Sequence, residues 1–112
     1  MARIAQRLIA GSQLTTAAAT YYTAPANTKA VISACRLTNT TAGAVTATVY
    51  LIASGGSASA SNTVLSAKSL AAGESYDVPI DGQVLLAGGF IQALASANTS
   101  ISIVASGTEI VE

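Results

Sequence analysis

Two stretches of alternating side chains within residues 29–53 constrain the fold more than any other feature of the sequence. Side chains on a strand repeat every two residues, and both stretches place small or apolar residues at that period. The segment between them begins with Asn39 and ends with Gly43, as in a short hairpin loop. We therefore predict a β-hairpin whose core face carries Val31, Ser33, Cys35, Leu37, Val45, Ala47, Val49 and Leu51, and whose opposite face carries Arg36, Thr38, Thr46, Thr48 and Tyr50.

The rest of the chain contains further segments of alternating side chains, each shorter than the two above. Alternating segments are separated by Gly, Pro, Asn or Asp about every ten residues, a spacing typical of β-sandwiches. We predict an all-β chain that forms a single antiparallel β-sandwich of the jelly-roll or Ig-like type, with about seven to nine short strands. Because 112 residues is the size of one domain, we expect a single domain over residues 1–112.

The N-terminal segment leaves alternatives open. Ile4 and Leu8 are four residues apart, which suits a short amphipathic helix, but the same segment also fits the period of a strand. Gly11 and Ser12 would end a helix at once, which favours an extended form. We predict an N-terminal arm or an edge strand over residues 1–14, followed by the sandwich over residues 15–112.

The composition predicts that the surface is partly covered by other subunits. Charged residues make up only 9% of the chain, hydrophobic residues make up 51%, and the formal net charge is zero. Low charge with many Val, Ile and Leu residues is the opposite of the disordered signature. A surface of Thr, Ser and Ala has little charge to keep copies of the chain apart.

The few charges are unevenly distributed along the chain. Arg3, Arg7, Lys29 and Arg36 precede every acidic residue, and Lys68 is the only base after them. Two explanations stay open. Either the two halves neutralise each other within one fold, or a basic N-terminal segment meets an acidic surface on a neighbour.

The residues needed for most catalytic and metal sites are missing. The chain has no histidine, which excludes Ser-His-Asp and Cys-His pairs and most zinc sites. Asp77 and Asp81 could act as paired carboxylates or bind calcium, but carboxylates at tight bends explain them without a ligand. Cys35, the single cysteine, is predicted to be a small buried hydrophobe. We expect no enzymatic activity, no cofactor and no metal.

Nucleic acid and membranes are not expected partners either. The five basic residues are scattered and have no aromatic pair for base stacking. Residues 1–11 contain no apolar run as long as a signal peptide core, and no apolar stretch of the sequence approaches the length of a membrane span.

Three polar motifs are assigned to exposed strands and turns. Tyr21 and Tyr22 are predicted to point to opposite faces of a strand, one onto the core and one outward. The sequences that begin at Asn39 and Asn98 match the N-glycosylation sequon, but both are interpreted as turns. Residues 54–62, which contain only Ser, Gly, Ala and Asn, are expected to form an exposed loop.

The turn sequences together resemble those of a known group of viral proteins. The segments that carry the resemblance are YTAPA at 22–26, LTNTT at 37–41, LAAGES at 70–75, VLLAGGFI at 84–91 and SGTEI at 106–110. They are similar to the small β-sandwich virion proteins of tailed bacteriophages, which serve as capsid decoration (cement) or head-fibre-like proteins. Where these proteins usually have an acidic residue after the "L-x-x-G" step, this chain has Gly89 and Phe90.

The resemblance implies a structural protein of a bacteriophage virion, which binds and stabilises the head shell through non-covalent subunit contacts. It implies a homo-oligomer, a trimer, that contacts the major capsid protein or another virion protein, sits on the capsid surface and is assembled in the host bacterial cytoplasm. The alternatives are a tail or head-fibre component, and a glycan-binding host-attachment module that would use Tyr21, Tyr22, Tyr50, Asp77 and Asp81. The candidate subunit or capsid contacts are Arg3, Ile4, Arg7, Leu8, Arg36, Thr46, Thr48 and Tyr50.

Overall fold

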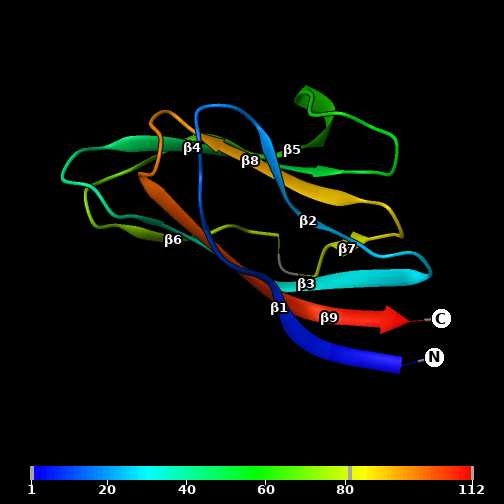
Figure 1. The fold of residues 1–112 in the computed structure, drawn as a ribbon. Coiled ribbons are helices and arrows are strands. Elements are labelled where there is room, and N and C mark those ends of the chain that lie inside the picture. The colour runs from blue at the N-terminus through cyan, green and yellow to red at the C-terminus, as the bar shows by residue number, and fades with distance from the viewer. Residues whose placement is uncertain (1, 81, 112) are drawn as a thin grey trace.

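The computed structural model describes residues 2–80 and 82–111, which form two antiparallel sheets packed face to face (Figure 1). The first sheet has the order β1-β9-β3-β6, with β7 also paired to β3, and the second has the order β2-β8-β4-β5. The predicted all-β sandwich is therefore confirmed. The strands are β1 (Ala2–Gln13), β2 (Ala19–Thr23), β3 (Thr28–Asn39), β4 (Val45–Ile52), β5 (Thr63–Leu70), β6 (Ser75–Asp77), β7 (Val84–Leu85), β8 (Phe90–Ala95) and β9 (Ile101–Val111), with a short 3-10 turn, η1 (Ala60–Asn62).

The connections distinguish between the two predicted types of sandwich. Strands β1, β2, β3 and β4 alternate between the sheets, and so do β7, β8 and β9. Strands β6 and β7 pair with two different parts of β3, so they occupy one edge position between them. This arrangement of four strand positions in each sheet, with crossings between the sheets, is the jelly roll. In Figure 1 the two layers diverge towards the end where both termini lie.

The predicted hairpin of residues 29–53 is wrong, because its two arms belong to different sheets. β3 pairs with β9, β6 and β7, whereas β4 pairs with β5 and β8. The physical reason lies at Asn39, whose side chain is fully buried at the end of β3. Its amide donates hydrogen bonds to the carbonyl oxygens of Gly43 (2.8 Å) and of Leu70 (3.0 Å). These bonds join the end of β3 to the second sheet, so the loop after β3 connects the two sheets instead of joining two neighbouring strands of one sheet.

The predicted core face of β3 is correct only in its second half. A β-bulge lies between Ile32 and Ala34, where the register with β9 shifts. A bulge inserts one extra residue and so reverses which side chains face the core. Ala30 and Ile32 are buried before the bulge in place of the predicted Val31 and Ser33, while Cys35 and Leu37 are buried after it as predicted. In β4 the prediction is correct for Val45, Ala47 and Val49, while Leu51 is only half-buried.

Residues 2–13 form an edge strand that pairs with β9 along its length. Two neighbouring side chains, Leu8 and Ile9, are both buried in the core because register shifts flank Ile9. Gly11, at a φ of 133°, lies within the second shift. β1 therefore contributes to the core and is not a detached arm.

The core is continuous between the two sheets and contains the cysteine as predicted. Cys35 is buried, and burial, with a smaller contribution from the charge of Asp77, raises the pKa of its thiol to about 12. The thiol is therefore protonated at neutral pH and unreactive. The largest fully buried side chains are Leu14, Ile32, Leu37, Ile52, Leu70, Ile80, Ile91, Ile101, Ile103 and Val49.

One buried carboxylate links the two sheets. Glu109 in β9 is 8% exposed, and the hydroxyl of Tyr22 in β2 donates a hydrogen bond to its Oε2 atom. Burial of the phenol, together with this hydrogen bond and the charge of Glu109, raises the pKa of Tyr22 above its ordinary value. The interaction crosses the interior and was not predicted, because residues 22 and 109 are far apart in the sequence.

Substituting Tyr22 with phenylalanine is expected to lower the free energy of unfolding by about 1–2 kcal/mol at neutral pH, since Glu109 loses a buried donor. Because the pKa of Tyr22 is raised in the folded state, its hydroxyl contributes stability that is fully present below the unfolded pKa of about 10. That contribution is lost as the pH rises through the folded pKa. Urea unfolding at several pH values should show a shallower alkaline loss in Tyr22→Phe than in the wild type.

The matched control is Tyr50→Phe, because the hydroxyl of Tyr50 makes no hydrogen bond with the described residues. It should leave the free energy of unfolding at neutral pH close to that of the wild type, because no hydrogen bond is lost. The Cys35 thiol, whose pKa is also raised, adds to the slope of every variant and cancels in the comparison. Identical slopes for Tyr22→Phe and the wild type would contradict the role assigned to the hydroxyl.

Candidate interaction surfaces

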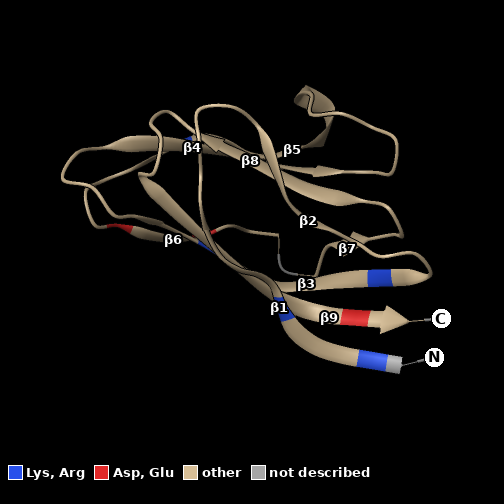
Figure 2. Ribbon diagram, viewed as in Figure 1, with Lys and Arg blue, Asp and Glu red and all other residues tan. Residues whose placement is uncertain are grey.

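The outer face of the first sheet gathers four of the chain's basic residues. Strand β9 alternates strictly between buried and half-buried residues from Ile101 to Ile110, so its even-numbered residues face outward. Opposite these residues lie Arg3 and Lys29 (both at Ile110), Arg7 (at Ser106) and Arg36 (at Val104). Figure 2 shows the blue segments of β1 and β3 in this layer.

Arg36 forms an ion pair within its own chain. Its Nε atom lies 2.8 Å from Oδ1 of Asp77 and its Nη2 atom lies 3.3 Å from Oδ2. This hydrogen-bonded pair lowers the pKa of Asp77, but both side chains are exposed. An exposed ion pair of this kind contributes little to stability. The pair joins β3 to β6 and leaves Arg36 only partly available to a partner.

The outer face of the second sheet carries the remaining predicted polar contacts. Thr46, Thr48 and Tyr50 are half-buried and face away from the core in β4. The hydroxyl of Thr48 accepts a hydrogen bond from the backbone N–H of Ala67 (3.0 Å). The prediction that Arg36 shares this face is wrong, because β3 and β4 are in different sheets and Arg36 lies on the opposite side of the sandwich.

The two apolar residues of the predicted N-terminal contact have different environments. Ile4 is 44% exposed, whereas Leu8 belongs to the core. Ile4 lies opposite Glu109 and therefore shares the inner side of the first sheet, at the end where the sheets diverge. Of this pair only Ile4 is accessible to another molecule in the single chain.

The residues of the glycan and calcium alternatives are dispersed. Tyr21 and Tyr22 are both half-buried against the core, because a register shift between Thr20 and Tyr22 disturbs the alternation of β2. The prediction that one of the two tyrosines points outward is therefore wrong. Asp77 is paired with Arg36, and Asp81 lies outside the described residues. Within residues 2–80 and 82–111, no three Cys, Asp or Glu side chains are close enough to hold a metal ion.

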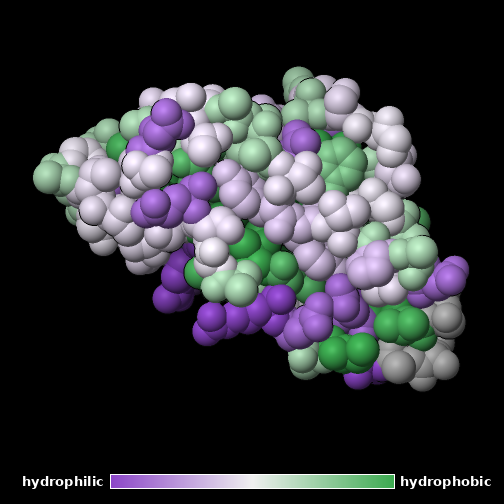
Figure 3. All heavy atoms as spheres, viewed as in Figure 1, coloured by the Kyte–Doolittle hydropathy of each residue, from purple (hydrophilic) through white to green (hydrophobic). Residues whose placement is uncertain are grey.

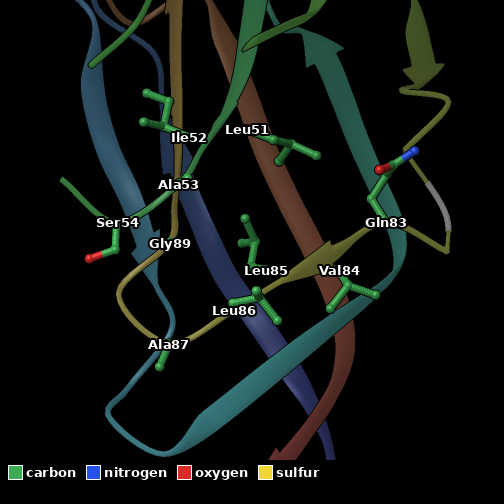
Figure 4. A pocket seen from close by; sticks show the side chains of 10 residues that line it. All are labelled: Leu51, Ile52, Ala53, Ser54, Gln83, Val84, Leu85, Leu86, Ala87 and Gly89. Atoms are coloured by element: carbon green, nitrogen blue, oxygen red, sulfur yellow. The ribbon is translucent and has the colours of Figure 1, made fainter. Parts of the chain in front are cut away.

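An apolar groove of about 530 Å³ opens between the end of β4 and the β7 segment (Figure 4). Val84 is 50% exposed and Leu86 is 63% exposed, while Leu85 between them is buried. Gly88 allows the segment after β7 to pack against Ser54 at one side of the groove, since a Cβ atom at residue 88 would lie 2.5 Å from Oγ of Ser54. The only signal in the sequence was the unbroken run Val84-Leu85-Leu86. The lining residues are Leu51, Ile52, Ala53, Ser54, Gln83, Val84, Leu85, Leu86, Ala87 and Gly89.

The turns at the two ends of the sandwich are largely as predicted. Residues 54–62 are mainly exposed, and the amide of Asn62 donates to the carbonyl oxygen of Ser57 (2.8 Å). Asn98 lies in an exposed turn, where its Oδ1 accepts from the backbone N–H of Thr16 (2.9 Å). The space-filling view in Figure 3 is dominated by pale residues of near-neutral hydropathy. In the part of the chain that the structure describes, no helix has the length and hydropathy needed to cross a bilayer.

The comparisons with known proteins concern the fold. No protein-family model matches the chain, and no curated protein matches its sequence. The chain is similar to a chain in the structure of infectious bursal disease virus, Gx strain, with a TM-score of 0.50 and 18% identity. The match covers 96% of this chain and 30% of the viral chain, so this chain spans about a third of that length. For the Gt strain of the same virus the TM-score is 0.47 and the identity 17%, over 96% and 31% of the two chains.

Proposed function

We propose that this chain is a structural protein of a bacteriophage virion that decorates and stabilises the capsid. The observation that carries the proposal is a jelly-roll sandwich with mainly small, uncharged outer residues, combined with the turn sequences that resemble phage virion proteins. The likeness in fold to a chain of another virus supports a virion role in general. The partner is the major capsid protein, and the decorating unit is a homo-oligomer, a trimer.

The proposed mechanism needs no chemistry beyond association. Two outer sheet faces and the exposed edge of β1 offer area that no other described strand covers. Burying such area between neighbouring coat subunits would hold them together, as apolar burial and pairing at strand edges do in other assemblies. A low surface charge reduces the electrostatic cost of bringing many copies close together.

Quantitative mass spectrometry of purified virions tests this proposal. A decoration protein is expected at a copy number comparable to that of the major capsid protein, because it repeats with the shell lattice. A few copies per particle would instead indicate a tail or head-fibre component, and absence from virions would overturn both virion roles. Native mass spectrometry of the purified chain should give the mass of a trimer, and a monomer would contradict that part of the proposal.

A further inference from the structure

We propose that the outer face of the first sheet is a docking surface for a protein partner with a carboxylate-rich surface. This docking surface rests on the proposed function for its partner in the virion, and it adds the chemistry of the surface that the partner presents. The strand register forms the surface by bringing residues from β1, β3, β7 and β9 into one face.

Among the described residues, the charges on this face are mostly of one sign. It carries Arg3, Arg7, Lys29 and Arg36, and among the described residues of its strands the only acidic side chain on this side is Asp77. Glu109 is the other described acid in these strands, and it is turned into the core. The uneven distribution of charge along the sequence therefore becomes a basic face in the fold. A partner that complements it must be acidic.

A row of three apolar residues and one threonine crosses this face between basic rows. Val84, Val31, Thr108 and Ala5 are aligned across β7, β3, β9 and β1 by the register. Lys29, Ile110 and Arg3 form the next row towards the termini, and Ser106 and Arg7 lie on the other side. Val84 is 50% exposed, so the row is accessible. An apolar centre with arginine around it is the composition of protein interfaces.

These features favour a protein partner over nucleic acid. Single-stranded nucleic acid binds proteins through aromatic platforms on which the bases stack. Among the described residues no aromatic side chain lies on this face: Tyr21, Tyr22, Tyr50 and Phe90 belong to the second sheet or its edge, and Tyr76, opposite Leu37, faces the core. Arg3 and Arg7 are four residues apart, roughly 13 Å along the strand, which is too sparse for a continuous phosphate track.

The size of the face predicts a weak contact that is sensitive to salt. Four strands about 4.8 Å apart and a length of about six residues give a face of roughly 15 by 20 Å. This is smaller than the area of about 800 Å² that each partner contributes to a standard interface. Binding through it would gain strength from many copies on one particle, and the exposed arginines would be screened by salt.

Binding to defined acidic polypeptides tests the inference without any virion. The probes are poly-L-glutamate, a glutamate–tyrosine copolymer and an oligodeoxythymidylate, each immobilised for biolayer interferometry with the purified full chain. We expect the wild type to bind both polypeptides, the copolymer more tightly, and to lose at least about tenfold in affinity between low salt and roughly 0.3 M NaCl. Tighter binding to the oligonucleotide than to either polypeptide, or no binding at all, would overturn the inference.

Three single variants locate the binding surface. Arg7→Glu should weaken binding to both polypeptides at least about tenfold, whereas the matched charge change Lys68→Glu, on the second sheet, should have less than about a twofold effect. Val84→Ser should remove the preference for the copolymer and leave binding to poly-L-glutamate intact. Equal losses for Arg7→Glu and Lys68→Glu would refute a specific face, and thermal melts show that each variant is folded. Since virion copy number is a separate measurement, this assay and the proposed function can fail independently.

Discussion

Replacing Gly107 with alanine is expected to lower the free energy of unfolding by about 3 kcal/mol, because the new methyl group has no space. A Cβ atom at this position would lie 2.2 Å from the carbonyl oxygen of Val31 and 3.0 Å from Cδ1 of Leu8. The first of these contacts is with the backbone of the neighbouring strand, next to the β3 bulge, so no side-chain rotation relieves it. The melting temperature should fall by roughly 10–20 °C.

This result would reverse the expectation from sequence. Glycine inside a strand is usually destabilising by about 0.5–1 kcal/mol relative to alanine, so the substitution would be expected to help. Gly43→Ala provides the matched control, since a Cβ atom there meets nothing within 4 Å. A Gly107→Ala protein that unfolds at or above the wild-type temperature would show that the backbone contact with Val31 is not as described.

Asn39→Asp is expected to destabilise the fold by about 3–5 kcal/mol at pH 7, although the two side chains have the same shape. The amide of Asn39 donates to the carbonyl oxygens of Gly43 and Leu70. Its Oδ1 accepts from the backbone N–H of Thr41 (2.9 Å) and from the hydroxyl of Thr41 (2.7 Å). A carboxylate keeps the second pair of bonds but faces two carbonyl oxygens with negative charge, in a fully buried position.

The penalty should depend on pH in a defined direction. The carbonyl oxygens of Gly43 and Leu70 can only accept hydrogen bonds, so they favour the protonated form of the new aspartate. Its pKa in the folded state is therefore raised above the unfolded value of about 3.9. The variant is therefore most stable relative to the wild type below about pH 3.9, where the aspartate is protonated in both states. Its stability falls as the pH rises through the pKa of the folded state. Urea unfolding of variant and wild type at several pH values between 3.5 and 8 gives the difference.

Asn98→Asp is the control for this prediction, because both asparagines begin the same type of sequon. Asn98 is exposed, and its oxygen only accepts a hydrogen bond from the backbone N–H of Thr16, which a carboxylate can also do. Its unfolding should stay close to that of the wild type. If Asn39→Asp were as stable as Asn98→Asp, the amide would not be holding the two sheets together.

Some residues of the interaction surface could be predicted from the sequence, but their arrangement on the two sheets could not. Low charge and the early position of the basic residues were visible in the sequence, and they identified Arg3, Arg7 and Arg36 as candidates. Leu8 was assigned to the same contact, but two register shifts turn it into the core. Thr46, Thr48 and Tyr50 were placed beside Arg36, and they lie on the other sheet. Such errors arise because a pattern of alternation identifies faces of a strand without identifying its neighbours.

The sequence by itself determined the class of the fold, since alternation and regular turn residues admit little other than a β-sandwich. It also determined which residue types are absent from the chain and that Cys35 is buried. Only the tertiary structure decided that β3 and β4 separate at Asn39, that Gly107 must lack a side chain, and that four basic residues meet on one face. Each of these depends on strand pairing and bulges, because contacts between residues far apart in the chain leave no local pattern in the sequence.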